Sequence, residues 1–344
     1  MKALVVEKPG VLTVKDVAEP TMGEYEARCE MLYGSTCAAT DQAVINGKFA
    51  LDVDYPCILG HESIGRVIEV GSKVRNYKVG DMVARVYTRV TDGINLAWGG
   101  FAEYGLALDW KAMKEDGLPA EDWDYYRVNQ VIPEGVIDPI DATMMITWRE
   151  NLSWVNRMGI KEGDRVLIVG SGANGLSIGA SAKCKGAEVT IIGNESRESN
   201  AKNIGLDAFI NYKDQEAINA YIKSNPFTLD YILDATGKRE TLTQFMPCLK
   251  ENGTAGVYGM NDYHTYTFNP IYGPKQFRFF NSWAGIYDEA ETHYEVLSLV
   301  SEGKLKADNW LYKDRIFTWE DATEAYEYVK EKKAIKTVIK LSTK

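Results

Sequence analysis

The sequence contains few of the cysteine and histidine side chains that stabilise small secreted proteins through disulfides or bound metals. Among its 344 residues are three histidines and five cysteines, Cys29, Cys37, Cys57, Cys184 and Cys248. The cysteines are odd in number, widely spaced and form no CxxC pair, so the pattern excludes a disulfide framework and favours a reducing compartment. We therefore predict a cytoplasmic protein.

Long apolar runs and an excess of positive charge are also missing. No run approaches the ~18 residues that span a membrane, and the apolar part of the N-terminus is too short for a secretion signal. The 39 Lys and Arg residues are outnumbered by 49 Asp and Glu residues, a formal net charge of −10. Because an acidic surface repels nucleic acid and anionic lipid, we expect a small-molecule partner, with no nucleic acid and no membrane.

The order of the apolar runs predicts an α/β protein with two kinds of domain. Up to about residue 130 the runs are short and bounded by Gly, Pro or charged turns, which is typical of a β-barrel. Later runs at 165–169, 188–192 and 231–234 alternate with helical stretches, the pattern of a doubly wound parallel sheet. We assign 1–135 to the first domain, 136–290 to the second, and 291–344 to a segment that returns to the first.

Three further helices and a last strand are predicted, one helix before the parallel sheet and the other elements in the segment that returns to the first domain. The helices are expected at 139–158, 292–302 and 320–331, and the strand at 337–341. In the last helix, one side collects Ala322, Ala325, Tyr326 and Val329, the spacing of a helix with one buried face.

A glycine-rich turn follows the first strand of the second domain. Gly170, Gly172 and Gly175 form GxGxxG between a strand and a helix, the context that a dinucleotide site requires. Gly170 allows the tight turn, Gly172 lets the backbone approach a pyrophosphate, and Gly175 allows close helix packing. Ala173 and Asn174 lie at the helix N-terminus, which attracts an anion. A tight connection without a ligand is the alternative.

The end of the next strand bears on the choice of dinucleotide. An NAD site usually places Asp or Glu there to bind the ribose 2′-OH, but this chain has Gly193 followed by Asn194. Without that carboxylate a 2′-phosphate is not repelled, and Arg197 is available to pair with it. A solvated Arg197 is the alternative, and an inward-pointing Glu195 would favour NAD. The residues favour NADP and leave NAD open.

One cysteine and one histidine of the first domain form a candidate metal pair. His61 lies in Gly60-His61-Glu62, just before a predicted strand, and Cys37 lies upstream. Thiolate and imidazole are both zinc ligands, and residues far apart in sequence can meet at one ion. From residue types alone, a buried thiol beside a structural histidine is the commoner arrangement.

Taken together, these motifs resemble the zinc-binding medium-chain dehydrogenases and reductases, the superfamily of alcohol, sorbitol, threonine and glucose dehydrogenases. The resemblance spans nearly the whole chain. It is carried by Gly60-His61-Glu62, the GxGxxG turn and residues 79–83, 99–104, 160–164 and 234–237. It implies a GroES-like β-barrel catalytic domain, a Rossmann domain, a C-terminal return to the barrel, and a homodimer or homotetramer.

The resemblance also implies an activity and a set of site residues. A catalytic zinc would be held by Cys37 and His61, with Glu62 as an exchangeable or supporting carboxylate. Thr40 would start a proton relay, and Tyr212 would line a 2′-phosphate. The implied reaction is NAD(P)-dependent interconversion of a secondary alcohol, of the sugar, polyol or cyclitol kind, and its ketone.

Three departures from the family pattern concern the zinc. The loop that follows Cys37 is one residue longer than usual, so either a bulge keeps the thiol on the metal or the thiol is displaced. No Cys, Asp or Glu lies near 146–147, where a third ligand is expected. Glu150, one turn later, is the substitute candidate, and pairing with Arg149 is its alternative role. Residues 84–110 contain no cysteine, so we expect one catalytic zinc per chain and no structural zinc.

Two other functions remain open at this point. A zinc-free reductase of the same fold, acting on an enone or a quinone, is favoured by the irregular ligand pattern and opposed by Cys37 and His61. A non-catalytic protein would bind the dinucleotide without turnover.

The substrate side is marked only by aromatic residues. Tyr87, Trp98, Trp110, Trp148 and Trp283 are candidates for substrate contact, although core packing is the commoner role of such side chains. The charged and aromatic residues 109–127 look like an insertion before the next strand.

Overall fold

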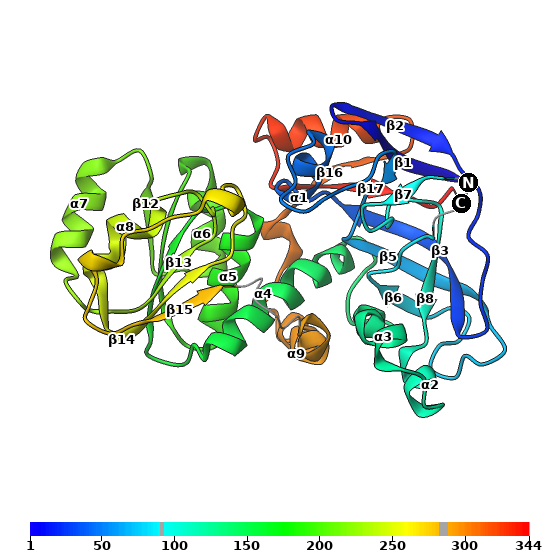
Figure 1. Ribbon diagram of the computed structural model, residues 1–344, viewed down its shortest axis with the longest axis horizontal. Helices are drawn as coiled ribbons and strands as arrows, with labels where there is room; N and C mark the ends of the chain where they lie inside the picture. Colours follow the sequence, from blue (N-terminus) through cyan, green and yellow to red (C-terminus); the bar gives the residue numbers. More distant parts are fainter. Residues whose placement is uncertain (90–92, 282–287, 344) are drawn as a thin grey trace. The chain divides into compact units, whose positions relative to one another are not determined.

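The computed structural model describes residues 1–89, 93–281 and 288–343. The chain forms two compact units, Met1–Ile146 together with His293–Lys344, and Thr147–Thr292. Figure 1 shows the course of the chain through both. The α/β fold class is confirmed, and the domain boundaries expected after residues 135 and 290 stay predictions. Within the described ranges, no helix is long and apolar enough to cross a membrane.

The first unit is built on two sheets. The smaller sheet has the order β2 (Val11–Asp16), β1 (Lys2–Lys8), β4 (Cys57–Ile58) and β7 (Asn95–Leu96). The larger has the order β16 (Leu311–Phe317), β17 (Lys336–Lys340), β3 (Glu26–Ser35), β5 (Ser63–Val70), β6 (Met82–Ala84) and β9 (Gln130–Ile132), with β8 (Tyr104–Leu108) also on β3. Most neighbouring strands are antiparallel; the pairs β4–β7 and β16–β17 are parallel.

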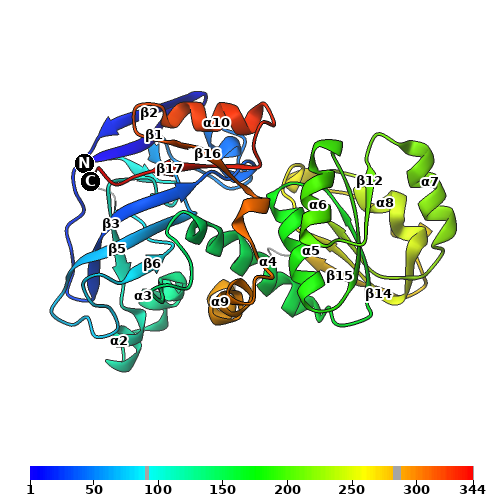
Figure 2. The same ribbon diagram turned by 180° about the vertical axis from the view of Figure 1, so that it is seen from behind.

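Short helices cover this barrel-like unit. They are α1 (Thr40–Ile45), α2 (Trp110–Glu115), α3 (Ala120–Trp123), α9 (His293–Ser301) and α10 (Ala322–Lys330). Helix α10 packs on β2, β16 and β17, as Figure 2 shows. Its buried residues are the four predicted from helical spacing, Ala322, Ala325, Tyr326 and Val329. That apolar stripe joins the core of the unit.

The last strand brings the end of the chain onto the middle of the larger sheet. Strand β17 pairs antiparallel with β3, placing Val338 opposite Ser35 and Ile339 opposite Gly34. Just beyond the pair, the hydroxyls of Thr36 and Thr337 lie 2.9 Å apart. This register holds the residue after β3, where the candidate metal ligands begin, against the C-terminal segment.

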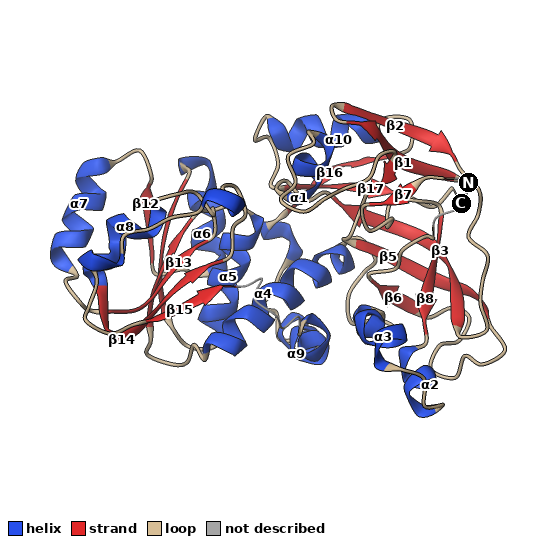
Figure 3. Cartoon of the chain, in the orientation of Figure 1, coloured by secondary structure: helices blue, strands red, loops and turns tan. Residues whose placement is uncertain are grey.

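The second unit contains one parallel six-stranded sheet. Its order is β12 (Ala208–Asn211), β11 (Glu188–Gly193), β10 (Arg165–Val169), β13 (Leu229–Asp234), β14 (Leu249–Val257) and β15 (Arg278–Asn281). The helices that alternate with these strands in Figure 3 are α5 (Ala173–Cys184), α6 (Glu198–Ile204), α7 (Gln215–Ser224) and α8 (Thr241–Phe245). This doubly wound arrangement confirms the predicted fold class of the region.

Some element boundaries differ from the prediction. The helix expected over 139–158 begins at Met145 as α4 (Met145–Met158), after a 3-10 turn (Asp141–Met144). The cause is local, because the Asp138 carboxylate accepts hydrogen bonds from the amides of Ile140 and Asp141 and holds a turn there. The predicted insertion consists of α2, α3 and a 3-10 turn (Asp124–Val128). Elements α7, β15 and β16 were not predicted.

Candidate metal centre and dinucleotide turn

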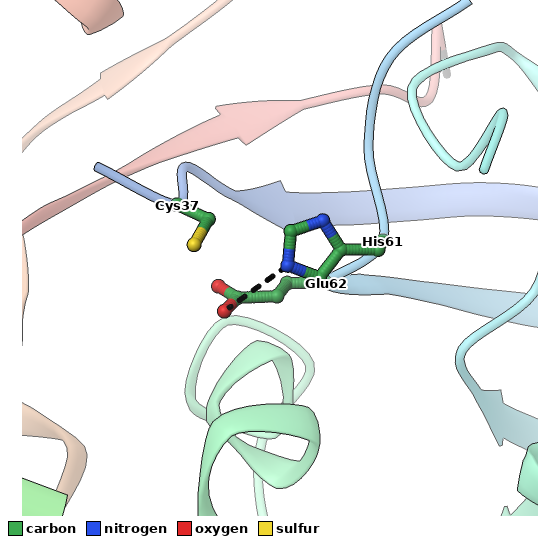
Figure 4. A group of neighbouring side chains, drawn as sticks. All are labelled: Cys37, His61 and Glu62. Atoms are coloured by element: carbon green, nitrogen blue, oxygen red, sulfur yellow. Dashed lines mark ion pairs between the residues drawn. The ribbon is translucent and has the colours of Figure 1, made fainter. Parts of the chain in front are cut away.

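Three buried side chains of the first unit point toward one another. The Cys37 thiol, a ring nitrogen of His61 and the Glu62 carboxylate offer ligand atoms that all lie within 4.8 Å of one another. Figure 4 shows the group, with His61 Nε2 facing Glu62 Oε1 at 3.9 Å. The predicted pair of Cys37 and His61 is therefore assembled, with Glu62 beside it.

Two loops of the barrel position these side chains. Cys37 lies two residues after β3, where its amide donates to Asp41 Oδ2 at 2.9 Å and its carbonyl accepts from the Asp41 amide at 3.0 Å. This closed turn fixes the loop that follows Cys37, and the thiol lies beside His61. On the other side, Gly60 has φ +103°, and a Cβ there would lie 2.4 Å from the ring of Phe101. A glycine is thus required just before His61.

Further buried groups hold the candidate ligands in place. His61 Nδ1 faces Asp41 Oδ1 at 3.5 Å. Glu62 Oε2 accepts a hydrogen bond from the Ser35 hydroxyl at 2.7 Å and pairs with the ammonium of Lys336. Lys336 is fully buried and also donates to the carbonyl of Thr36 at 3.3 Å.

The charges of this cluster act on its titratable groups. Burial alone would lower the pKa of His61, but contact with Cys37 and the charges of Asp41 and Glu62 raise the pKa to about 9. Burial likewise opposes the charge of Lys336, and its pKa is nevertheless raised because Glu62 is so close. The pKa of Asp41 is raised, mainly by its burial. In the absence of a metal, these contacts favour the protonated form of His61.

The donor set fits a zinc ion. Sulfur, imidazole nitrogen and carboxylate oxygen are the three ligand types of protein zinc sites. In a zinc site the histidine commonly directs its second nitrogen at a carboxylate, and Asp41 provides that partner for His61. Neither His61 Nδ1 nor Asp41 Oδ1 has a hydrogen-bond partner among the described residues, so both remain available to each other.

Two predicted members of the site are not in this group. Thr40 is the first residue of α1 and is half-buried, and among the described residues its hydroxyl forms no hydrogen bond to Cys37, His61 or Glu62. Glu150 lies on α4 in the second unit. Proton relay by Thr40 and metal binding by Glu150 stay predictions, as does the absence of a structural zinc.

Three supporting residues, Ser35, Asp41 and Lys336, were not predicted from the sequence. Asp41 is four residues from Cys37, a spacing that could have suggested a side chain folded back on the loop. Lys336 lies 274 residues after Glu62 in the sequence. The only signal there is a lysine next to an apolar strand. Ser35 ends a strand and carries no distinct signal.

The glycine-rich turn of the second unit has the form that a phosphate requires. Gly170 has φ +112°, and a Cβ on Gly175 would lie 1.8 Å from the Gly170 carbonyl oxygen, so both positions require glycine. Gly172 differs, because a Cβ there would meet no atom within 4 Å. The first turn of α5, with Ala173 and Asn174, therefore begins at an open backbone surface.

The strand ends beside this turn contain the other predicted cofactor residues. A Cβ on Gly193 would lie 2.1 Å from Ser171 Oγ, and that hydroxyl accepts a hydrogen bond from the Asn194 amide at 2.9 Å. Ser171 thus occupies the space that an acidic side chain at 193 would need. The amide of Tyr212, which is half exposed, donates to the Gly193 carbonyl at 2.9 Å, and Arg197 lies one 3-10 turn on.

The aromatic candidates for substrate contact have different surroundings. Tyr87 and Trp98 line one pocket of the first unit, and Trp110 lines another. Trp148 is fully buried. Trp283 lies outside the described residues.

Comparison with known proteins agrees with this arrangement. Residues 23–117 match the alcohol dehydrogenase GroES-like domain, and residues 173–302 match the zinc-binding dehydrogenase domain. The NADP-dependent isopropanol dehydrogenase of Clostridium beijerinckii is 32% identical over 250 residues, which cover 68% of this chain and 69% of that protein. The chain belongs to the zinc-binding medium-chain dehydrogenases. It is an NAD(P)-dependent oxidoreductase of the alcohol and polyol dehydrogenase type.

Two proteins that match over nearly the whole chain have a lower identity to it. D-arabinitol dehydrogenase 1 of Uromyces fabae is 24% identical over 351 residues, covering 99% of this chain and 97% of that one. The crystal structure of benzyl alcohol dehydrogenase from Acinetobacter calcoaceticus superimposes with a TM-score of 0.80 at 19% identity, over 99% of both chains. At that identity the second match supports the fold alone.

Proposed function

We propose that this dehydrogenase interconverts a secondary alcohol and its ketone, with one zinc per chain and with NADP preferred over NAD. The observation that carries the proposal is the buried group of Cys37, His61 and Glu62, which joins three zinc-ligand types within 4.8 Å. A substrate of the sugar, polyol or cyclitol kind is supported by the arabinitol dehydrogenase, which matches over nearly its full length. Cytoplasmic location and a homodimer or homotetramer stay predictions.

The residues of the site have separate tasks in this reaction. Cys37, His61 and Glu62 would hold the zinc, and Glu150 is the candidate for a further ligand. Bound zinc supplies a Lewis acid for the alcohol oxygen, and bound NADP supplies a hydride acceptor. Thr40 would pass the alcohol proton toward solvent.

The supporting residues prepare the ligands for that task. Asp41 faces Nδ1 of His61 and favours a proton on that nitrogen, which leaves Nε2 free to bind a metal. Lys336 pairs with the Glu62 carboxylate in a buried environment and so compensates its charge next to the thiol.

Metal content tests the proposal directly. We expect plasma mass spectrometry of the purified, untagged protein to find about one zinc per chain, since three buried donor groups already lie together. Chelation should remove oxidation of secondary alcohols, and added zinc should restore it. A protein that takes up no zinc even after supplementation would contradict the proposal, and enones and quinones would then be the substrates to test.

The preference for NADP rests on the residues around Gly193. Ser171 fills the place of the acidic side chain that binds the ribose 2′-OH of NAD, and Asn194, Arg197 and Tyr212 surround the same strand ends. A 2′-phosphate would find a cation there and no carboxylate at position 193.

Substitution of Arg197 should change the KM for NADP and the KM for NAD to different extents. In Arg197→Gln we expect the KM for NADP to rise about tenfold or more, because one charge-assisted contact to a phosphate is lost, while the KM for NAD changes little. Steady-state kinetics with both nucleotides measures this. Lys223→Gln, an exposed cation at the end of α7, is the matched control. Equal changes for both nucleotides would show that Arg197 does not contact the 2′ position.

A further inference from the structure

A pocket of about 380 Å³ lies in the first unit beside the metal group. Its volume is in the range of small-molecule sites. One wall comes from the barrel, with Phe49, Tyr87 and Trp98. Two more lining residues, Tyr125 and Tyr126, come from the segment 110–128. This segment overlaps the predicted insertion, 109–127.

The pocket and the candidate metal ligands share a side chain. The ring of Trp98 lies 4.9 Å from the His61 ring, centroid to centroid, and the ring of Phe49 packs edge-on against Trp98 at 5.7 Å. The backbone is connected as well, since Gly100 N donates to the Gly60 carbonyl at 2.7 Å. A molecule in contact with Trp98 therefore lies one side chain from His61.

The side chains that line this pocket are mainly apolar, and several of them are aromatic rings with flat faces. Besides the five aromatic rings it contains the aliphatic side chains Leu51, Val53, Leu96, Ala97, Leu106 and Leu108. Three charged residues line it, Glu26, Asp52 and Arg89, and Asp52 is exposed to solvent. Glu26 and Arg89 are paired with each other, and Glu26 also accepts from the Gly23 amide at 2.6 Å. An open polyol chain directs its hydroxyls to all sides and would leave several of them against apolar walls, which is unfavourable, whereas a ring with equatorial hydroxyls carries them along its edge. A ring offers a flat C–H face to the aromatic walls.

We propose that this pocket makes the enzyme selective for an alcohol carried on a six-membered ring, and that Tyr125 and Tyr126 are specificity-determining residues. The inference rests on the proposed function, since the alcohol must react at the metal group. A hydroxylated ring, such as a cyclitol or pyranose, and a plain cyclohexyl ring share this chemistry.

Two matched substrate pairs isolate the ring. Cyclohexanol and hexan-2-ol have the same carbon number and one hydroxyl, and myo-inositol and sorbitol have six carbons and six hydroxyls each. With the zinc-loaded enzyme and NADP, we expect kcat/KM for the ring member to exceed that for the open chain at least about tenfold in one pair or both. The pair with the larger ratio tells a plain ring from a hydroxylated one.

Variants test the assignment of the two tyrosines. In Tyr125→Ala and Tyr126→Ala we expect the ring preference to fall about tenfold, mainly through KM, with unchanged zinc content. Tyr125→Phe and Tyr126→Phe should keep the preference, because the ring face is retained. Tyr294→Ala, an exposed tyrosine on α9 outside this pocket, is the control.

The outcomes separate this inference from the proposed function. Equal kcat/KM within both pairs, or a ring preference that survives both alanine variants, overturns the inference while alcohol oxidation stands. If the zinc-loaded enzyme oxidises no alcohol, the proposed function fails first. Calorimetric titration with cyclohexanol and with myo-inositol then tests whether the pocket binds a ring. The inference is refuted if neither compound binds, or if the Tyr125→Ala and Tyr126→Ala proteins bind both compounds as the unchanged protein does.

Discussion

Cys37→Ser and His61→Ala proteins are expected to oxidise secondary alcohols about a thousandfold more slowly than the unchanged enzyme. Each substitution removes one of three buried donors that lie within 4.8 Å. The Lewis acid contributes several kcal/mol to the stabilisation of the reacting oxygen, and about 4 kcal/mol corresponds to a thousandfold in rate. Zinc per chain, measured on the same samples by plasma mass spectrometry, should fall together with kcat.

A second cysteine provides the control for this experiment. Cys57 on β4 is buried, like Cys37, but belongs to the apolar core rather than to the metal group. Cys57→Ser should keep its zinc and its rate, at the cost of some stability. If Cys37→Ser keeps both as well, the thiol is not a ligand, and the zinc mechanism is refuted.

Loss of the Lys336 ammonium should produce the largest change in stability. Lys336→Met removes the ammonium that pairs with Glu62 Oε2 and leaves the buried carboxylate with His61, at 3.9 Å, as its remaining cationic neighbour. Breaking a buried pair in this way costs about 3–5 kcal/mol. Urea unfolding of the zinc-free protein measures the free energy of unfolding without the contribution of bound metal. Lys330→Met is the comparison, since that lysine pairs with Glu327 at the surface and such pairs contribute at most about 1 kcal/mol.

The pH dependence of the buried pair follows from the direction of the pKa shift. Glu62 raises the pKa of Lys336 above its ordinary value, so the folded state binds this proton more tightly than the unfolded chain does. The stabilisation is therefore complete below the unfolded pKa of lysine, about 10.4, and is lost as pH rises through the folded value. Equal unfolding free energies of Lys336→Met and the unchanged protein at neutral pH would show that the pair is not stabilising.

Most of the fold could be predicted because its signals are local. The buried face of α10 follows from helical spacing, and the alternation of strands and helices in the second unit follows from the apolar runs. Elements without such a signal were missed. Helix α7 buries only Ile218, β15 is mostly exposed, and β16 has polar residues along its middle. In these segments tertiary contacts decide the structure.

The residues of the candidate site also fall into those that could be predicted from the sequence and those that could not. Cys37 and His61 could be named because few residue types bind zinc and the motif around His61 is specific. Whether the longer loop would keep the thiol in place was open, since it depends on how the Asp41 side chain folds back on the Cys37 amide. The partner of Glu62 could not be predicted, because the contact joins residues 274 positions apart and a sequence pattern carries no such pairing.

The distance along the chain between Glu62 and Lys336 imposes an order on biosynthesis. At about 5–20 residues per second, a ribosome adds the lysine on the order of tens of seconds after the glutamate. Throughout that interval β3 lacks its pairing with β17 and Glu62 lacks its cation. The nascent chain therefore cannot pair this carboxylate with its cation, and the metal group reaches its final form only after Lys336 has emerged from the ribosome.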